Sequence, residues 1–110
     1  MKTVITSSGD EVTAQFDKRF GRTGWFCLIE EGTEDVNFYF NNLKDVSNGA
    51  GIKAAEKMVE LNVQKVISGD FGPKARDLLN TFNIQMVMLS EDNLTIGDII
   101  NRLNNKNNRR

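Results

Sequence analysis

One pattern occurs twice in the second half of the chain. Residues 62–67 and 83–88 share the order Asn, β-branched residue, Gln, any residue, Val, apolar residue. The first copy follows an amphipathic segment that begins at Gly51, and the second follows a segment over 73–82 that begins with proline. Each copy therefore predicts a helix that leads into a strand. Two successive units place parallel strands in one sheet through right-handed crossovers. Two copies are too few for a solenoid.

The first half of the chain is typical of strands. Residues 2–6 and 23–30 are short apolar segments, and the second lacks alternation, which favours burial on both faces. Residues 35–41 alternate between apolar and polar side chains, which predicts a half-exposed strand in a hairpin with the one before it. Its exposed face would carry Asn37, Tyr39 and Asn41. A capping-box pattern at Thr95 and Asp98 predicts the start of a last helix.

The resulting order, β-β-β-α-β-α-β-α, predicts an α/β fold with a mixed five-stranded sheet covered by helices. The length of 110 residues indicates a single domain, which we place at residues 1–103. Residues 104–110 are polar and basic without periodicity, so we expect a disordered tail there. Four of the 14 basic residues and none of the 15 acidic ones follow residue 101. The rest of the chain is thus acidic, which disfavours nucleic-acid binding.

The absence of histidine excludes many kinds of active site. It rules out histidine acid–base catalysis, Ser-His-Asp and Cys-His triads, and histidine zinc sites. The one cysteine, Cys27, lies among apolar residues and is predicted to be a buried small hydrophobe. The lone cysteine favours a cytoplasmic location, and the chain shows neither a membrane span nor a signal peptide. Asp10, Glu11, Asp17 and Asp70 do not make a nuclease cluster, because the first strand carries no acid. We predict no catalytic and no metal-ligating residue.

Three glycine-containing segments are predicted to meet at one edge of the sheet. They lie where the first, third and fourth strands end or the following helices begin, which is where ligands bind in open α/β sheets. The candidate binding residues are Arg19, Phe20, Gly21, Arg22, Asn48, Gly49, Ala50, Gly51, Ser68, Gly69, Asp70 and Gly72. Glycine admits close backbone approach, and helix N-termini offer free N–H groups to anions. The alternative is that the glycines serve only tight turns and the arginines are only surface charges.

The same segments carry a family resemblance. Phe20-Gly21-Arg22, the Gly-Ala-Gly-Ile-Lys-Ala-Ala-Glu of 49–56 and the Val-Ile-Ser-Gly-Asp-Phe-Gly-Pro-Lys-Ala of 66–75 occur in this order. The chain resembles the dinitrogenase iron-molybdenum cofactor biosynthesis family over residues 2–103. The resemblance implies a ribonuclease-H-like fold without nuclease activity, and a metal–sulfur cluster as ligand at this edge. Many members carry histidine at the positions of Arg19 and Asn48 and cysteine at that of Ser68.

Together these features favour a non-enzymatic protein that binds or carries an anionic metal–sulfur cluster or its precursor. The cofactor would be a molybdenum/iron–sulfur cluster held non-covalently by backbone N–H groups, and cluster donor or acceptor proteins would be its partners. A regulatory module that binds a phosphate-bearing metabolite through the same amides is one alternative. A protein–protein adaptor that uses the exposed face of the third strand is another. We expect neither nucleic acid nor a membrane as partner.

Overall fold

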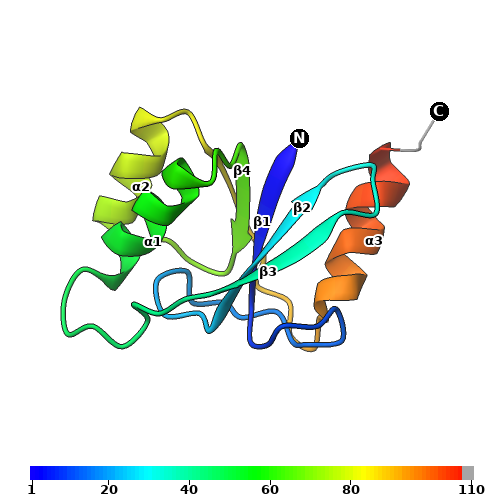
Figure 1. Ribbon diagram of the computed structural model, residues 1–110, viewed down its shortest axis with the longest axis horizontal. Helices are drawn as coiled ribbons and strands as arrows, with labels where there is room; N and C mark the ends of the chain where they lie inside the picture. Colours follow the sequence, from blue (N-terminus) through cyan, green and yellow to red (C-terminus); the bar gives the residue numbers. More distant parts are fainter. Residues whose placement is uncertain (108–110) are drawn as a thin grey trace.

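The computed structural model describes residues 1–107 and contains one mixed five-stranded sheet with three helices (Figure 1). The elements are β1 (Lys2–Ser7), β2 (Trp25–Glu30), β3 (Val36–Phe40), α1 (Ala50–Glu60), β4 (Lys65–Ser68), α2 (Pro73–Thr81), β5 (Gln85–Met88) and α3 (Ile96–Asn107). The strands lie in the order β3-β2-β1-β4-β5, antiparallel from β3 to β1 and parallel from β1 to β5. The predicted α/β fold and element order are therefore confirmed.

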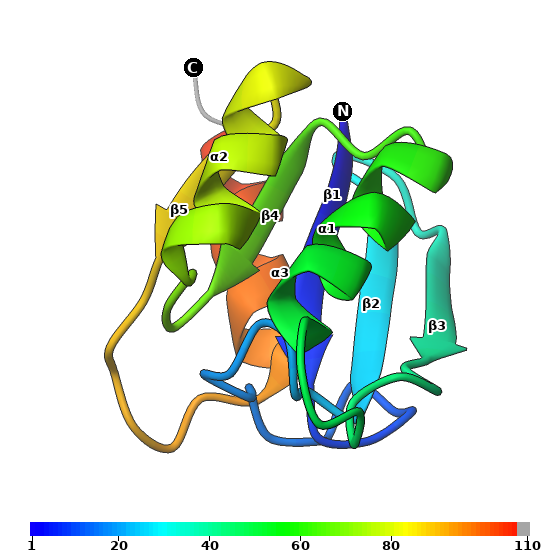
Figure 2. The ribbon, with the colours of Figure 1, turned by 90° about the vertical axis from the view of Figure 1, so that its left-hand side faces the viewer.

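The helices cover both faces of the sheet. Helices α1 and α2 pack side by side on one face and α3 packs on the other, as the two ribbon views show (Figures 1 and 2). Adjacent residues of the central strand β1 contribute to the hydrophobic cores on the two faces of the sheet. Val4 belongs to the core under α1 and α2, and Ile5 belongs to the core under α3. Both side chains are completely buried. None of the described helices is long and apolar enough to span a membrane.

The ends of the helices follow local sequence signals. Asn62 and Asn83, the first residues of the repeated pattern, both have a φ of 58°, which is the left-handed conformation that asparagine tolerates after a helix. At the start of α3 the predicted capping box is formed. The Asp98 amide donates to Thr95 Oγ1 at 3.1 Å, and the Thr95 amide donates to Asp98 Oδ2 at 3.0 Å. Helix α3 continues to Asn107, so residues 104–107 are helical rather than part of a disordered tail, and 108–110 lie outside the described residues.

The prediction for the exposed face of the third strand was right for Asn37, which is exposed, and wrong for Tyr39 and Asn41. Tyr39 packs against the core under α1, and Asn41 is only 6% exposed, whereas Phe40 is 53% exposed. Asn41 is buried because its amide group donates to the carbonyl oxygens of Gly21 and Thr23, at 3.1 and 3.0 Å. A polar side chain at the end of an alternating run thus points inward, where it satisfies backbone acceptors. The predicted adaptor face of Asn37, Tyr39 and Asn41 does not form an exposed surface.

The long connection between β1 and β2 lies across the carboxyl edge of the parallel strands. It is anchored by Phe16 and Phe20, which are buried, and by isolated bridges from Ser7 to Phe16 and from Arg19 to Asp70. The Gly69 amide donates to the Lys18 carbonyl at 3.1 Å. These contacts place the segment after Phe20 directly beside the N-terminus of α1.

Candidate functional site

A cavity of about 790 Å³ opens at the carboxyl edge of the sheet, between the loop after β1 and the N-termini of α1 and α2. All the predicted binding residues line it except Ser68 and Gly69. Sequence reasoning did not assign four further lining residues, which are Ile52, Pro73, Lys74 and Ala75. These residues could have been found from their position in the first turns of the two helices that follow the glycine segments.

Two glycines of the cavity wall have a structural reason, one in close packing and the other in its backbone conformation. A Cβ atom on Gly21 would lie 2.6 Å from the backbone nitrogen of Gly51, which is closer than real Cβ atoms approach. Gly49, the N-cap residue of α1, has a φ of 77°, where other residues are strained. Gly21 therefore lets the loop after Phe20 touch the start of α1, and Gly49 allows the turn that leads into this helix.

Ser68 and Gly69 support the cavity from behind rather than lining it. Ser68 is completely buried, and its Oγ lies 2.9 Å from Thr6 Oγ1, which also donates to the Asp17 carbonyl. A Cβ atom on Gly69 would lie 2.3 Å from the Cβ of Lys18. Gly69 is thus explained by the packing of two chain segments.

The helix N-termini at the cavity offer unpaired donors. Neither α1 nor α2 has a side-chain cap, and neither has an acidic residue in its first turn. The first backbone hydrogen bonds run from Lys53 to Gly49 and from Arg76 to Gly72, both at 2.9 Å. Among the described residues, no acceptor is hydrogen-bonded to the amides of 50–52 or of 74–75. Helix α3, which does not line the cavity, is the contrast, because Thr95 and Asp98 cap it.

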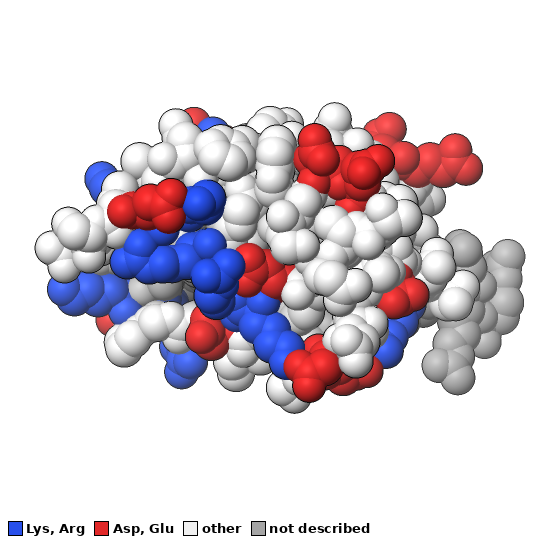
Figure 3. All heavy atoms as spheres, turned by 90° about the horizontal axis from the view of Figure 1, so that it is seen from below, with Lys and Arg blue, Asp and Glu red and all other residues white. Residues whose placement is uncertain are grey.

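The charges around the cavity are mostly positive. Figure 3 views this edge of the sheet from below and shows Lys and Arg side chains gathered around a hollow in the surface. Arg19, Arg22 and Lys74 line the cavity, together with a single acid, Asp70. Two helix N-termini add about half a positive charge each. The field in the cavity therefore favours an anion.

The two arginines are already held by the protein. Arg19 donates to both carboxylate oxygens of Asp17, at 3.1 and 3.0 Å, and Asp17 is nearly buried. The hydrogen bond and the charge of Asp17 raise the pKa of Arg19. Arg22 donates to the carbonyl oxygens of Lys44 and Val46, at 2.7 and 2.8 Å, which ties the loop before α1 to the cavity rim. Both guanidinium groups are therefore fixed in position by the protein itself.

The cavity contains no cysteine, and the described residues contain no group of three or more metal-ligating Cys, Asp or Glu side chains. Cys27 is completely buried in the core under α3, on the other face of the sheet. Burial raises the pKa of its thiol to about 12. The prediction that Cys27 is a buried hydrophobe is confirmed.

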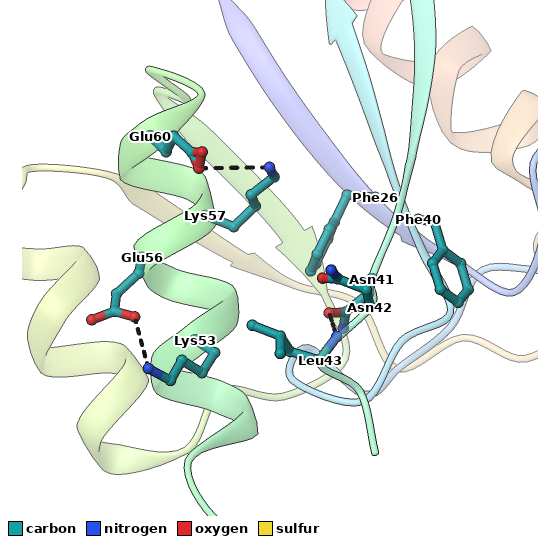
Figure 4. A pocket seen from close by; sticks show the side chains of 9 residues that line it. All are labelled: Phe26, Phe40, Asn41, Asn42, Leu43, Lys53, Glu56, Lys57 and Glu60. Carbon is teal, nitrogen blue, oxygen red and sulfur yellow. Dashed lines mark hydrogen bonds and ion pairs between the residues drawn. The ribbon is translucent and has the colours of Figure 1, made fainter. Parts of the chain in front are cut away.

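A second, smaller cavity of about 270 Å³ lies between the end of β3 and α1 (Figure 4). Its α1 wall carries two internal ion pairs, Lys53–Glu56 at 3.8 Å and Lys57–Glu60 at 3.6 Å. In each pair the lysine and the glutamate balance each other's charge, and no helix N-terminus lines this cavity. It therefore lacks the features that favour an anion in the larger cavity.

Comparison with known proteins identifies the family. The sequence matches the family model described as dinitrogenase iron-molybdenum cofactor over residues 1–106. The chain belongs to this family. The resemblance seen in the glycine segments is confirmed by this match, which covers nearly the whole chain.

Solved structures show the same fold. The apo form of the orange protein from Desulfovibrio gigas is 26% identical, with a TM-score of 0.84 over 92% of this chain and 84% of that one. A putative NifB protein from Thermotoga is 21% identical, with a TM-score of 0.76 over 91% of this chain and 84% of that one. A search of curated proteins gave no match. The chain thus shares its fold with both proteins over most of their length.

Proposed function

We propose that this protein binds and carries an anionic metal–sulfur cluster or cluster precursor, as cargo, in the cavity at the carboxyl edge of the sheet. The observation that carries the proposal is that two uncapped helix N-termini line one cavity together with three cationic side chains. The family and the likeness to the apo form of the orange protein support it. The protein acts as a carrier and not as an enzyme, with cluster donor and acceptor proteins as partners.

The residues present fit such a cargo. The metals of a sulfide-rich anion need no protein ligand when its sulfur atoms accept hydrogen bonds from backbone N–H groups. The free amides of Ala50, Gly51, Ile52, Lys74 and Ala75 supply those donors. The positions where many family members carry histidine hold Arg19 and Asn48 here. In place of metal ligands, Arg19 would supply positive charge and the neutral Asn48 amide would supply a hydrogen-bond donor.

A phosphate-bearing metabolite is the second candidate, since the same amides would hold a phosphate group. The two candidate ligands differ in the atoms that would accept the hydrogen bonds. Sulfur-rich anions have soft, weakly hydrated acceptors, whereas phosphate esters carry strongly hydrated oxygens. Direct comparison of the two kinds of ligand on the same protein therefore distinguishes them.

The test is an anaerobic titration of the full chain with tetrathiomolybdate, followed by its visible absorption and by thermal unfolding. We expect a changed absorption band, co-elution on gel filtration and an unfolding temperature that rises with ligand concentration. Nucleotides and sugar phosphates are titrated in parallel. Stabilisation by these compounds alone, with no spectral change from tetrathiomolybdate, would support the metabolite-binding module instead.

Two lysine variants locate the binding. Lys74 lines the cavity in the first turn of α2, and Lys2 lies at the start of β1, at the opposite edge of the sheet. Lys74→Gln weakens tetrathiomolybdate binding several-fold, because it removes one charge next to the free amides. Lys2→Gln leaves it unchanged. Equal effects of the two variants would mean that the anion is attracted by the whole protein rather than by the cavity.

A further inference from the structure

One acidic side chain faces the proposed anion site. Asp70 follows β4 and lines the cavity with Arg19, Arg22 and Lys74. A carboxylate at this position repels an anion, so its presence opposes the field of the two helix N-termini. Neither the fold nor the packing accounts for it, because the side chain of Asp70 is exposed.

No side chain that the structure describes forms an ion pair with Asp70. Its neighbour across the isolated bridge is Arg19, whose guanidinium is bound to both oxygens of Asp17 instead. Arg22 is occupied by the carbonyl oxygens of the loop before α1. Among the side chains that the structure describes, no hydrogen bond or salt bridge involves the Asp70 carboxylate. Its negative charge therefore acts on whatever enters the cavity.

We propose that Asp70 is a specificity-determining residue that lowers the affinity of the cavity for anions in proportion to their charge. This inference rests on the proposed function, and it adds a reason for the carrier to release its cargo. Two helix N-termini and the cations would hold a multiply charged cluster firmly. An uncompensated carboxylate in the same cavity weakens that hold, so the cargo stays exchangeable with an acceptor protein.

The size of the effect follows from Coulomb's law. One unit charge at about 7 Å in the high dielectric of an exposed cavity changes the affinity for a monoanion by about threefold. For a dianion the interaction energy doubles, so the change is about tenfold. Because the carboxylate is exposed, salt screens this interaction, and the effect shrinks as the ionic strength rises.

The experiment measures the dissociation constant of tetrathiomolybdate, a dianion, for the wild type, Asp70→Asn and the control Asp77→Asn. Asp77 is an exposed acid on α2 that does not line the cavity. We expect binding to Asp70→Asn to be about tenfold tighter at low ionic strength and nearly equal to wild type in 0.5 M salt. Asp77→Asn binds within about twofold of wild type at both. Asp70→Ala, a second variant, gives the same gain as Asp70→Asn.

The outcomes separate this proposal from the function on which it rests. Wild-type binding with an unchanged or weaker affinity in both Asp70 variants overturns the role of Asp70 and leaves the carrier function intact. A weaker affinity would mean that the carboxylate coordinates the cargo. Binding by the Asp70 variants alone supports repulsion by Asp70 and contradicts a wild-type carrier of this anion. Absence of binding in every variant overturns both.

Discussion

Replacing Gly72 by aspartate tests whether free amides make the binding site. Gly72 is the N-cap residue of α2, with φ and ψ of −65° and 161°, which is the backbone geometry of a side-chain cap. A Cβ atom added there meets nothing within 4 Å. Pro73 has no N–H group, so the free donors of the first turn are the amides of Lys74 and Ala75. An aspartate side chain at position 72 would bond to those donors.

The substitution moves stability and binding in opposite directions. A capping aspartate raises the free energy of unfolding by a few tenths of a kcal/mol over glycine, and its interaction with the helix dipole brings the total gain to about 1 kcal/mol. For a domain of this size the unfolding temperature then rises by about 4 °C. The cargo loses a charge-assisted hydrogen bond worth about 2 kcal/mol and meets a new negative charge, so its affinity falls at least about thirtyfold.

Urea unfolding and anaerobic titration with tetrathiomolybdate measure the two effects of Gly72→Asp on the same preparation. Gly72→Asn is the matched control, because it caps the same amides without the charge and should weaken binding less. A variant that is more stable than wild type and still binds with wild-type affinity would refute the role of the α2 amides. A loss of stability would refute the capping geometry.

Three further predictions concern the stability of the fold. Gly69→Ala destabilises the protein by about 2 kcal/mol in urea unfolding, because its Cβ would lie 2.6 Å from the backbone of the neighbouring loop. Gly51→Ala makes only an ordinary contact at 3.5 Å and is neutral or stabilising, and equal losses for the two variants would contradict the packing argument. The free energy of unfolding falls by about 2 kcal/mol between pH 8 and pH 10, since the pKa of Cys27 is raised by burial to about 12, above its unfolded value of about 8.5. Cys27→Ala removes this contribution to the pH dependence, and an identical slope in wild type and variant would show that the thiol does not cause it. Thr95→Ala costs about 1 kcal/mol by removing the cap of α3. The acid destabilisation below about pH 4 that comes from Asp98 should diminish only in part in this variant, because the pKa of Asp98 is lowered first by the backbone amide of Thr95, which alanine keeps, and second by the Thr95 side chain. Complete disappearance of the acid transition would argue against that order of causes.

The sequence was sufficient to predict the structure wherever a residue type has a characteristic local role, such as ending or capping a helix. The asparagines at 62 and 83 end helices in the left-handed conformation, and Thr95 and Asp98 form the capping box that their spacing predicts. Alternating and continuous apolar runs located the first three strands to within two residues, and the repeated pattern indicated β4 and β5. The order of these elements then places the glycine segments at one edge, because parallel strands end together.

Sequence reasoning failed where a side chain is directed by a distant partner. Asn41 continues a polar alternation, yet the carbonyl groups of Gly21 and Thr23 hold it inside the protein. The arginines were predicted as donors to a ligand, but Asp17, two residues away, holds Arg19, and loop carbonyls hold Arg22. The hydrogen bonds of Asn41 and Arg22 join residues that only the folded chain brings together. The end of α3 was missed because asparagines dilute its periodicity after Leu103.

Backbone amide resonances test the central claim most directly, because the claim concerns those N–H groups themselves. In a nitrogen–proton correlation spectrum recorded during titration with tetrathiomolybdate, the amides of 50–52, 74 and 75 should shift most. The Gly97 amide, which already donates to the Val12 carbonyl at 2.8 Å, should not move. Large shifts confined to residues outside the cavity, with the amides of the two helix N-termini unchanged, would contradict the account.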